Sequence, residues 1–155
     1  EMLLMRIFIY VVLVIFFSPI NSISGELEFP KFDADFTDSN CKEKWTKRGV
    51  YDENMHKVCM QHNRDYYEGA FAIFNEYKSE KRMHEVVKFQ IKRFTKRGNI
   101  DWVQVKVNLA LEKEGFLDVE YMIQQNEVSQ DTLNKCKKKW FPEYRRMRYC
   151  IKKGN

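Results

Sequence analysis

Apolar residues recur along this chain with two different periods, a helical one in the middle and an alternating one further on. The helical set, at steps of three and four residues, is Tyr67, Ala70, Phe71, Phe74 and Tyr77. Over residues 103–111, and again over residues 117–123, apolar residues instead occupy every second position. Helical side chains return to one face about every 3.6 residues, whereas strand side chains do so at every second residue. The first segment therefore predicts a helix, and the two later segments predict strands.

Turn residues and two further segments complete a prediction of the α+β class. The helix is expected to end near Lys81, and Gly98-Asn99 and residues 112–115 are expected to form turns. The expected strands span residues 86–94, 102–111, 116–124 and 146–152. No internal repeat is expected. The predicted fold is one helix packed on an antiparallel β-sheet.

The beginning of the chain has the layout of a secretory signal peptide. Arg6 precedes an apolar run over residues 7–17, and Ser22-Ile23-Ser24 supplies the small residues that a signal peptidase reads. The run is shorter than the roughly 20 residues that a membrane-spanning helix needs. We therefore expect a signal peptide over residues 1–25, a secreted, extracellular protein and no membrane span after cleavage. A signal anchor is the alternative.

The rest of the chain is long enough for one domain. Four cysteines in a secreted chain of this size indicate two disulfides, for which three connectivities are possible. These cysteines are Cys41, Cys59, Cys136 and Cys150. We expect an N-terminal arm with two of them over residues 26–62 and the folded domain over residues 63–155. Cys59 and His62 form a lone Cys-x-x-His pair without a second pair nearby, so neither a metal nor another cofactor is expected.

Basic residues outnumber acidic ones, and the formal net charge is +5. The basic clusters are Lys92-Arg93 with Lys96-Arg97, Lys135 with Lys137–Lys139, and Arg145-Arg146 with Arg148. Such clusters can bind polyanions or acidic membrane surfaces, and more often they form a solvated sheet face. No nucleic-acid partner is expected. The histidines have no Ser/His/Asp or Cys/His context, so we do not expect an enzyme.

Two blocks of sequence resemble the secreted cystatins. FLDVEYMIQQNEVSQDTLNKC (residues 116–136) resembles a central strand and the following loop of that family, and FAIFNEYKSE (residues 71–80) is similar to its helix. The interval from Cys136 to Cys150 also matches the spacing of two family cysteines. The resemblance implies a cystatin-like fold, with one helix on an antiparallel β-sheet, and reversible inhibition of papain-like cysteine proteases.

The inhibitory edge of the cystatins is incomplete in this chain. The family's Gln-x-Val-x-Gly hairpin and Pro-Trp hairpin are both missing from the sequence, and Lys96 and Arg97 flank the candidate hairpin glycine. This pattern resembles the divergent reproductive-tract branch, so inhibition is expected to be weakened or lost. The residues that the resemblance assigns to protease binding are Gly49, Lys96, Arg97, Gly98 and Asn99.

A helical carrier is the alternative to the cystatin hypothesis. Secreted odorant-binding-like proteins are basic, carry four cysteines and hold small hydrophobic ligands. The interval from Cys41 to Cys59, followed by Tyr66-Tyr67, is similar to the first part of some salivary members. That fold would need residues 101–124 to be helical, against their alternating pattern. Helix content therefore separates the two hypotheses.

Overall fold

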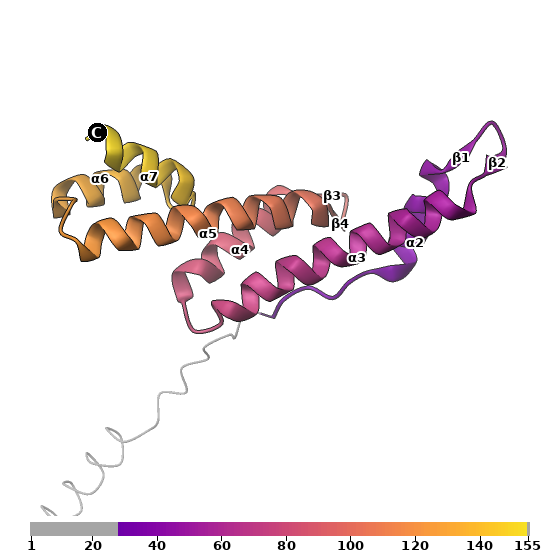
Figure 1. Cartoon of the computed structure of the whole chain (residues 1–155), viewed down its shortest axis with the longest axis horizontal. Helices are drawn as coiled ribbons and strands as arrows, with labels where there is room; N and C mark the ends of the chain where they lie inside the picture. Colours follow the sequence, from indigo (N-terminus) through magenta and orange to yellow (C-terminus); the bar gives the residue numbers. More distant parts are fainter. Residues whose placement is uncertain (1–27, 155) are drawn as a thin grey trace, which may run out of the picture.

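The computed structural model describes residues 28–154, which fold into helices joined by short turns and two small β-hairpins (Figure 1). The helices are α2 (Ala34–Lys44), α3 (Glu53–Glu76), α4 (Lys81–Arg93), α5 (Trp102–Gln124), α6 (Gln130–Trp140) and α7 (Tyr144–Lys153). The hairpins are β1 (Thr46–Lys47) with β2 (Val50–Tyr51), and β3 (Thr95–Lys96) with β4 (Asn99–Ile100). The signal peptide expected over residues 1–25 lies outside the described residues.

The predicted α+β, cystatin-like fold is wrong. The protein is mostly helical, and each of the two sheets in the described residues has only two strands of two residues. Three of the expected strands, over residues 86–94, 102–111 and 116–124, lie mainly within α4 and α5, and the fourth, over residues 146–152, lies in α7. The turn expected at residues 112–115 is the middle of α5.

The alternating pattern misled because α5 packs against α3, α4 and α7 and is therefore apolar on several sides. Val105 and Leu109, four residues apart, are buried, whereas Val107 is exposed. A helix without one clean polar face has no helical stripe to detect. The run of valines and leucines consequently resembled a strand, although its burial follows the helical period.

The expected helix corresponds to α3, but α3 begins well before it and ends at Glu76, short of the expected end near Lys81. Asp52 caps α3 by accepting a hydrogen bond from the backbone N–H of Met55 at 3.0 Å. The expected boundary between an arm over residues 26–62 and a domain over residues 63–155 therefore falls inside one continuous helix. The part of the arm before Asp33 runs extended along α3 (Figure 1). There Phe29 is buried against the rings of Phe74 and Trp102.

The helix–hairpin–helix unit α2–β1–β2–α3 is repeated as α4–β3–β4–α5, so the expectation of no internal repeat is also wrong. In both units an aromatic residue, Trp45 or Phe94, follows the first helix, and an aspartate, Asp52 or Asp101, caps the second. The two turns also contain an equivalent backbone hydrogen bond. Asp52 N–H donates to the Trp45 carbonyl at 3.0 Å, and Asp101 N–H donates to the Phe94 carbonyl at 3.0 Å.

The pair α6–α7 has the same layout with a shorter turn, in which the peptide bond before Pro142 is cis. Its Cys136, Trp140, Glu143 and Cys150 keep the spacings, within each helix, of Cys41, Trp45, Asp52 and Cys59 in the first unit. The chain in residues 28–154 is therefore three helical pairs in a row. The pair α4–α5 carries Gln90 and Asn108 where the other two pairs carry cysteines.

The two expected disulfides are confirmed, and each joins the helices of one pair. Cys41 bonds to Cys59 between α2 and α3, and Cys136 bonds to Cys150 between α6 and α7. The Cα atoms are 5.8 Å apart in both. Each bridge lies beside the turn of its own pair, so the disulfides hold together the helices of the two outer pairs. The central pair, α4–α5, has no disulfide and is stabilised by its buried side chains. Each disulfide would typically contribute about 2–4 kcal/mol.

Helix α5 forms the centre of the core, with α3 on one side and α7 on another. Gly115 allows α7 to approach closely, since a Cβ there would lie 2.7 Å from the backbone nitrogen of Arg145. Tyr144, at the start of α7, packs edge-on against Phe116 with ring centroids 5.1 Å apart. This close crossing of α5 and α7 determines where the charged face of α7 points.

Candidate functional site

Helix α7 divides sharply into an apolar face and a basic face. Tyr144, Met147, Cys150 and Ile151, at helical spacing, are buried against the core. The basic residues between and directly after them are Arg145, Arg146, Arg148, Lys152 and Lys153. Cations in the last turn of a helix also interact favourably with its negative end. The packing of the apolar face thus holds the basic residues together on the outside of α7.

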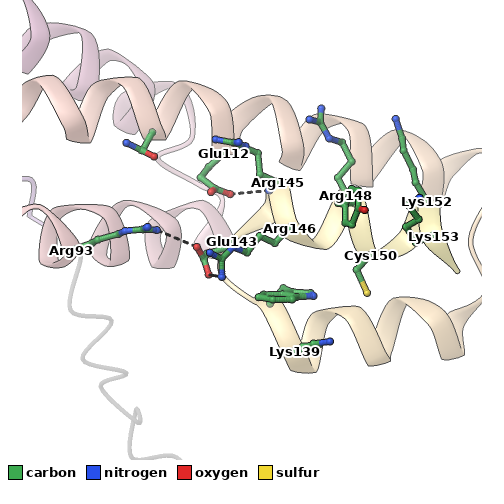
Figure 2. Close-up of a pocket in the computed structure, with 13 residues that line it drawn as sticks. Arg93, Glu112, Lys139, Glu143, Arg145, Arg146, Arg148, Cys150, Lys152 and Lys153 are labelled. Atoms are coloured by element: carbon green, nitrogen blue, oxygen red, sulfur yellow. Dashed lines mark hydrogen bonds and ion pairs between the residues drawn. The ribbon is translucent and has the colours of Figure 1, made fainter. Parts of the chain in front are cut away.

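The basic face of α7 forms one wall of a cleft of about 1080 Å³ whose other walls come from α4, α5 and the end of α6 (Figure 2). We call this the basic cleft. Its cationic lining residues are Arg93, Lys139, Arg145, Arg146, Arg148, Lys152 and Lys153. In the part of the chain that the structure describes, only two carboxylates, Glu112 and Glu143, line it. The basic cleft therefore carries a strong excess of positive charge.

Glu143 links two walls of the basic cleft. One of its oxygens lies 3.1 Å from Arg93 Nη1 of α4, and the other lies 3.3 Å from Arg146 Nη1 of α7 (Figure 2). The Glu143 side chain is only 16% exposed, whereas the two arginines are about half exposed. One carboxylate thus orients two guanidinium groups and leaves their outer faces accessible to a ligand.

Glu112 lies on the α5 wall and holds the first turn of α7. Its Oε2 accepts a hydrogen bond from the backbone N–H of Arg145 at 3.0 Å (Figure 2). Glu143, the residue that precedes α7, makes no side-chain capping bond, so a carboxylate from another helix performs that role. Burial raises the pKa of Glu112, and the hydrogen bond from Arg145 N–H opposes that rise.

Four cations of the basic cleft make no ion pair with any of residues 28–154: Lys139, Arg145, Lys152 and Lys153. Two of the cationic groups, Lys139 Nζ and the Arg146 guanidinium, lie over the Trp140 ring, 5.2 and 5.0 Å from its centroid. Arg148 pairs with Asp118 at 2.7 Å. Most of the positive charge in the basic cleft is therefore available to an anionic ligand.

The basic clusters that form this cleft are visible in the sequence, but their arrangement is not. Arg93, Lys139 and Arg145 belong to three separate clusters, and they were expected to lie on a solvated sheet face or to bind polyanions. The structure brings them together because α4 and α7 both pack on α5. Glu112 was missed because it was assigned to a turn. The helical spacing of the basic residues after Glu143 is the signal that could have revealed the site.

The residues assigned to protease binding lie on the two hairpins, away from α6 and α7 (Figure 1). Gly49 is in the β1–β2 turn and Gly98 in the β3–β4 turn, both with positive φ. Lys96 and Asn99 are paired across the second hairpin, and Arg97 stands at its tip. The turn expected at Gly98 thus exists, but it joins two helices rather than two strands of a large sheet.

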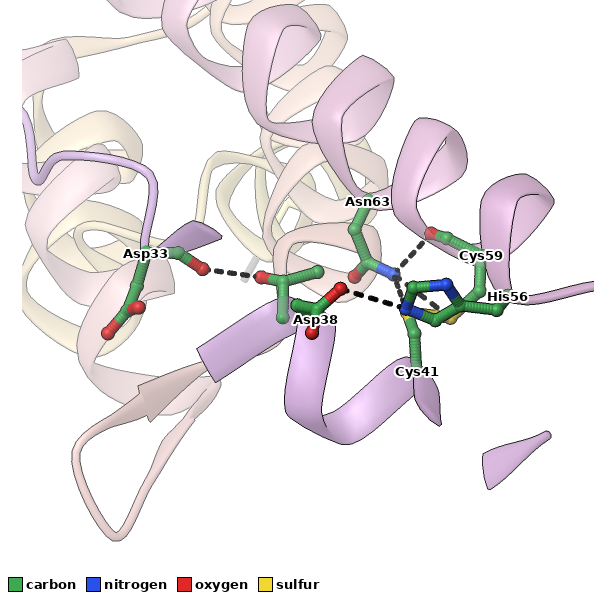
Figure 3. Close-up of a disulfide and its surroundings, with 7 residues drawn as sticks. Asp33, Asp38, Cys41, His56, Cys59 and Asn63 are labelled. Atoms are coloured by element: carbon green, nitrogen blue, oxygen red, sulfur yellow. Dashed lines mark hydrogen bonds and ion pairs between the residues drawn. A yellow bond between two sulfur atoms is a disulfide. The ribbon is translucent and has the colours of Figure 1, made fainter. Parts of the chain in front are cut away.

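The first disulfide lies in a structural environment rather than a reactive one (Figure 3). Asn63 Nδ2 donates to the Cys59 carbonyl at 2.9 Å and lies over both sulfur atoms. His56 Nε2 lies 3.0 Å from an Asp38 carboxylate oxygen, which ties α3 to α2. These contacts join the same two helices as the disulfide. We therefore assign this polar cluster to the stability of the first pair.

Within residues 28–154, no group of His, Cys, Asp and Glu is arranged to hold a metal ion. In the same part of the chain no helix has the length and apolar character needed to cross a membrane. The sequence matches no protein-family model, no curated protein and no solved structure.

Proposed function

We propose that the protein binds a sulfated polysaccharide in the basic cleft. The observation that carries the proposal is the convergence of seven cationic side chains from α4, α6 and α7 on one cleft that only two carboxylates share. Two disulfides fit an oxidising, extracellular compartment, where sulfated polysaccharides are abundant. Secretion itself is part of this proposal.

The extent of the basic cleft favours a chain of anionic groups over a single small anion. From Arg145 to Lys153 the basic face of α7 extends over roughly 12 Å at the helical rise of about 1.5 Å per residue. Arg93 and Lys139 add charges on the facing walls. A lone sulfate would contact only a few of these groups. Successive sulfate groups along a polymer would contact the whole row.

The side chains of the cleft suit sulfate chemistry. Guanidinium groups present pairs of N–H donors that match two oxygens of a sulfate, and such charge-assisted bonds are stronger than neutral ones. Glu143 holds Arg93 and Arg146 in place before binding, which lowers the entropy lost when a ligand binds. Trp140, which is partly buried and lines the cleft, adds an apolar surface for a sugar ring.

Heparin-affinity chromatography tests the proposal directly. We expect the folded wild-type protein to be retained and to elute only at elevated NaCl, because salt screens charge contacts and releases counterions. The variant Arg145→Ala/Lys152→Ala should elute at clearly lower NaCl. The matched control Lys88→Ala/Lys135→Ala removes the same charge from exposed helix positions outside the cleft. Equal elution of the two variants would contradict the proposal.

Carriage of a hydrophobic ligand and inhibition of a papain-like protease stay predictions, as does the expectation that the protein is no enzyme. An apolar hollow of about 200 Å³ is lined in part by Phe29, Val87 and Ile91. Ligand pockets for drug-sized molecules usually measure about 300–1,000 Å³. The helical fold favours a carrier over a cystatin, but this hollow is small for one. The basic cleft is the stronger candidate.

A further inference from the structure

The sequence Thr-Lys-Arg-Gly occurs twice, once in each β-hairpin, as Thr46–Gly49 and Thr95–Gly98. The two units that contain these hairpins have otherwise diverged widely. Even the disulfide of the first unit, Cys41–Cys59, is replaced by Gln90 and Asn108 in the second. Exposed turns tolerate substitution more readily than cores do. Four identical residues at an exposed turn therefore need a specific reason.

The fold accounts for two of the four residues. The Thr46 hydroxyl donates to the Lys42 carbonyl at 2.7 Å, and the Thr95 hydroxyl donates to the Ile91 carbonyl at 2.6 Å. Each bond ties a hairpin to the last turn of the preceding helix. The two glycines have φ of 78° and 83°, a conformation that costs other residues energy. Threonine and glycine are thus required by the turn.

The fold does not account for the two arginines or for Lys96, whereas Lys47 Nζ lies over the Trp45 ring, 5.6 Å from its centroid. Arg48 and Arg97 also have positive φ, at 52° and 51°, where hairpin turns of two residues prefer asparagine, aspartate or glycine. All four basic side chains are exposed, and within residues 28–154 none of them forms an ion pair. An arginine held twice at a position that suits asparagine better indicates that its guanidinium is used.

A groove of about 970 Å³ runs from the base of the first hairpin to the second hairpin, and Lys96 is the tip residue that lines it. Lys44 and Trp45, at the base of the first hairpin, line it together with Lys96 and Asn99 of the second. In Figure 1 the β1–β2 hairpin lies at the end of the molecule opposite α6 and α7, and the β3–β4 hairpin lies between that end and the middle. Among residues 28–154, Asp101, which caps α5, is the one carboxylate lining the groove. A ligand in the groove therefore contacts Lys96 directly, and a linear ligand that continues past Lys44 and Trp45 reaches the first hairpin.

We propose that Lys47-Arg48 and Lys96-Arg97 are two equivalent anion-binding tips that hold one linear sulfated polysaccharide at two points. This site is separate from the basic cleft and does not depend on it. A chain long enough to reach both tips gains affinity because the second contact is intramolecular once the first has formed. A chain too short to do so binds at one tip only.

The test uses variants that keep the turns intact. Lys47→Ala/Arg48→Asn and Lys96→Ala/Arg97→Asn each remove one tip and place asparagine at the position that prefers it. Binding of heparin fragments of increasing length is measured by calorimetry in the full-length protein. We expect each single-tip variant to lose about tenfold or more in affinity for long fragments. For fragments too short to span the tips, the loss should be about twofold.

Two results would overturn the proposal. The variant that lacks both tips could bind long fragments as tightly as wild type, which would leave the tips without a ligand. Alternatively, the loss in each single-tip variant could be the same at every fragment length, which would exclude simultaneous contact. The Arg145→Ala/Lys152→Ala variant separates this site from the basic cleft. If this variant binds heparin as tightly as wild type while the tip variants lose affinity, the result contradicts binding in the basic cleft and supports binding at the tips.

Discussion

The carboxylate of Glu112 accepts a hydrogen bond from the backbone N–H of Arg145 at 3.0 Å, and this bond joins the middle of α5 to the first turn of α7. Glu112 is 5% exposed. A buried carboxylate is costly unless it is hydrogen-bonded, and free N–H groups at a helix start need an acceptor. The single hydrogen bond therefore satisfies both the buried carboxylate of Glu112 and the free backbone N–H of Arg145. The orientation of the basic face of α7 depends on this contact.

Glu112→Gln tests the charge state of that carboxylate. Burial raises the pKa of Glu112 in the folded protein above the ordinary value of about 4.3. A carboxyl whose folded pKa is raised stabilises the protein below its unfolded pKa, and this contribution is lost as pH rises through the folded pKa. Wild type should therefore lose stability relative to Glu112→Gln as the pH rises from about 4 toward neutrality.

The measurement is thermal unfolding of both proteins across this range. Glu80, whose pKa is lowered by its hydrogen bond to Arg82, contributes in the opposite direction. Because Glu80 is present in both proteins, its contribution cancels in the difference. If the two stability profiles run parallel, burial does not perturb Glu112.

Gly115→Ala tests the close crossing of α5 and α7. A Cβ at this position would lie 2.7 Å from the backbone nitrogen of Arg145 and 2.8 Å from the carbonyl carbon of Tyr144. Because backbone atoms cannot move aside as a side chain can, α7 must shift. We expect a loss of about 1–3 kcal/mol in the free energy of unfolding, measured with urea.

Gly69→Ala is the matched control for this change. Gly69 is also inside a long helix, but the atoms nearest a new Cβ belong to the flexible side chain of Lys106, at 3.2 Å and beyond. Alanine has the higher helix propensity, so this variant should be neutral or more stable by up to about 1 kcal/mol. Equal destabilisation of the two variants would contradict the close crossing.

Gln90→Cys/Asn108→Cys tests the repeat. Gln90 and Asn108 occupy the positions that correspond to Cys41 and Cys59, and the hairpin between them has the same register. Gln90 is fully buried, and its amide atoms have no hydrogen-bond partner in residues 28–154. We expect a third disulfide to form spontaneously and to add about 3 kcal/mol of stability.

Mass spectrometry after thiol labelling measures whether the bond forms, and thermal unfolding with and without reductant measures its contribution. Each single-cysteine variant serves as the control, since it changes the core without closing a loop. Two free thiols in the folded double variant would show that the second pair does not repeat the geometry of the first.

Part of this fold could be predicted from the sequence, and the remaining predictions were wrong for identifiable physical reasons. Four cysteines predicted two disulfides correctly, and the spacing around Phe71 and Phe74 predicted a helix. The strands were wrong because α5 contacts three other helices, so Val103, Val105 and Val107 lie on different sides of one helix rather than on a sheet. Sequence alternation cannot distinguish a strand from a helix that is apolar on several sides.

The candidate site was visible only in pieces. The basic clusters around Arg93, Lys139 and Arg145 are plain in the sequence, but nothing local shows that α4 and α7 pack on the same helix. The repeat had a local signal, Thr-Lys-Arg-Gly at Thr46 and again at Thr95, and it was missed. Comparison of the chain with itself over that tetrapeptide would have favoured two equivalent helical units.

An NMR titration of the ¹⁵N-labelled wild-type protein with a heparin hexasaccharide tests the central claim most directly, because it places the ligand on the molecule. Binding in the basic cleft predicts that backbone amide signals of residues 145–153 shift progressively, together with those of Arg93 and Lys139. Desulfated fragments should leave them unchanged. The proposal would be contradicted if the α7 signals stay unshifted at a ligand concentration at which signals elsewhere in the protein have shifted fully.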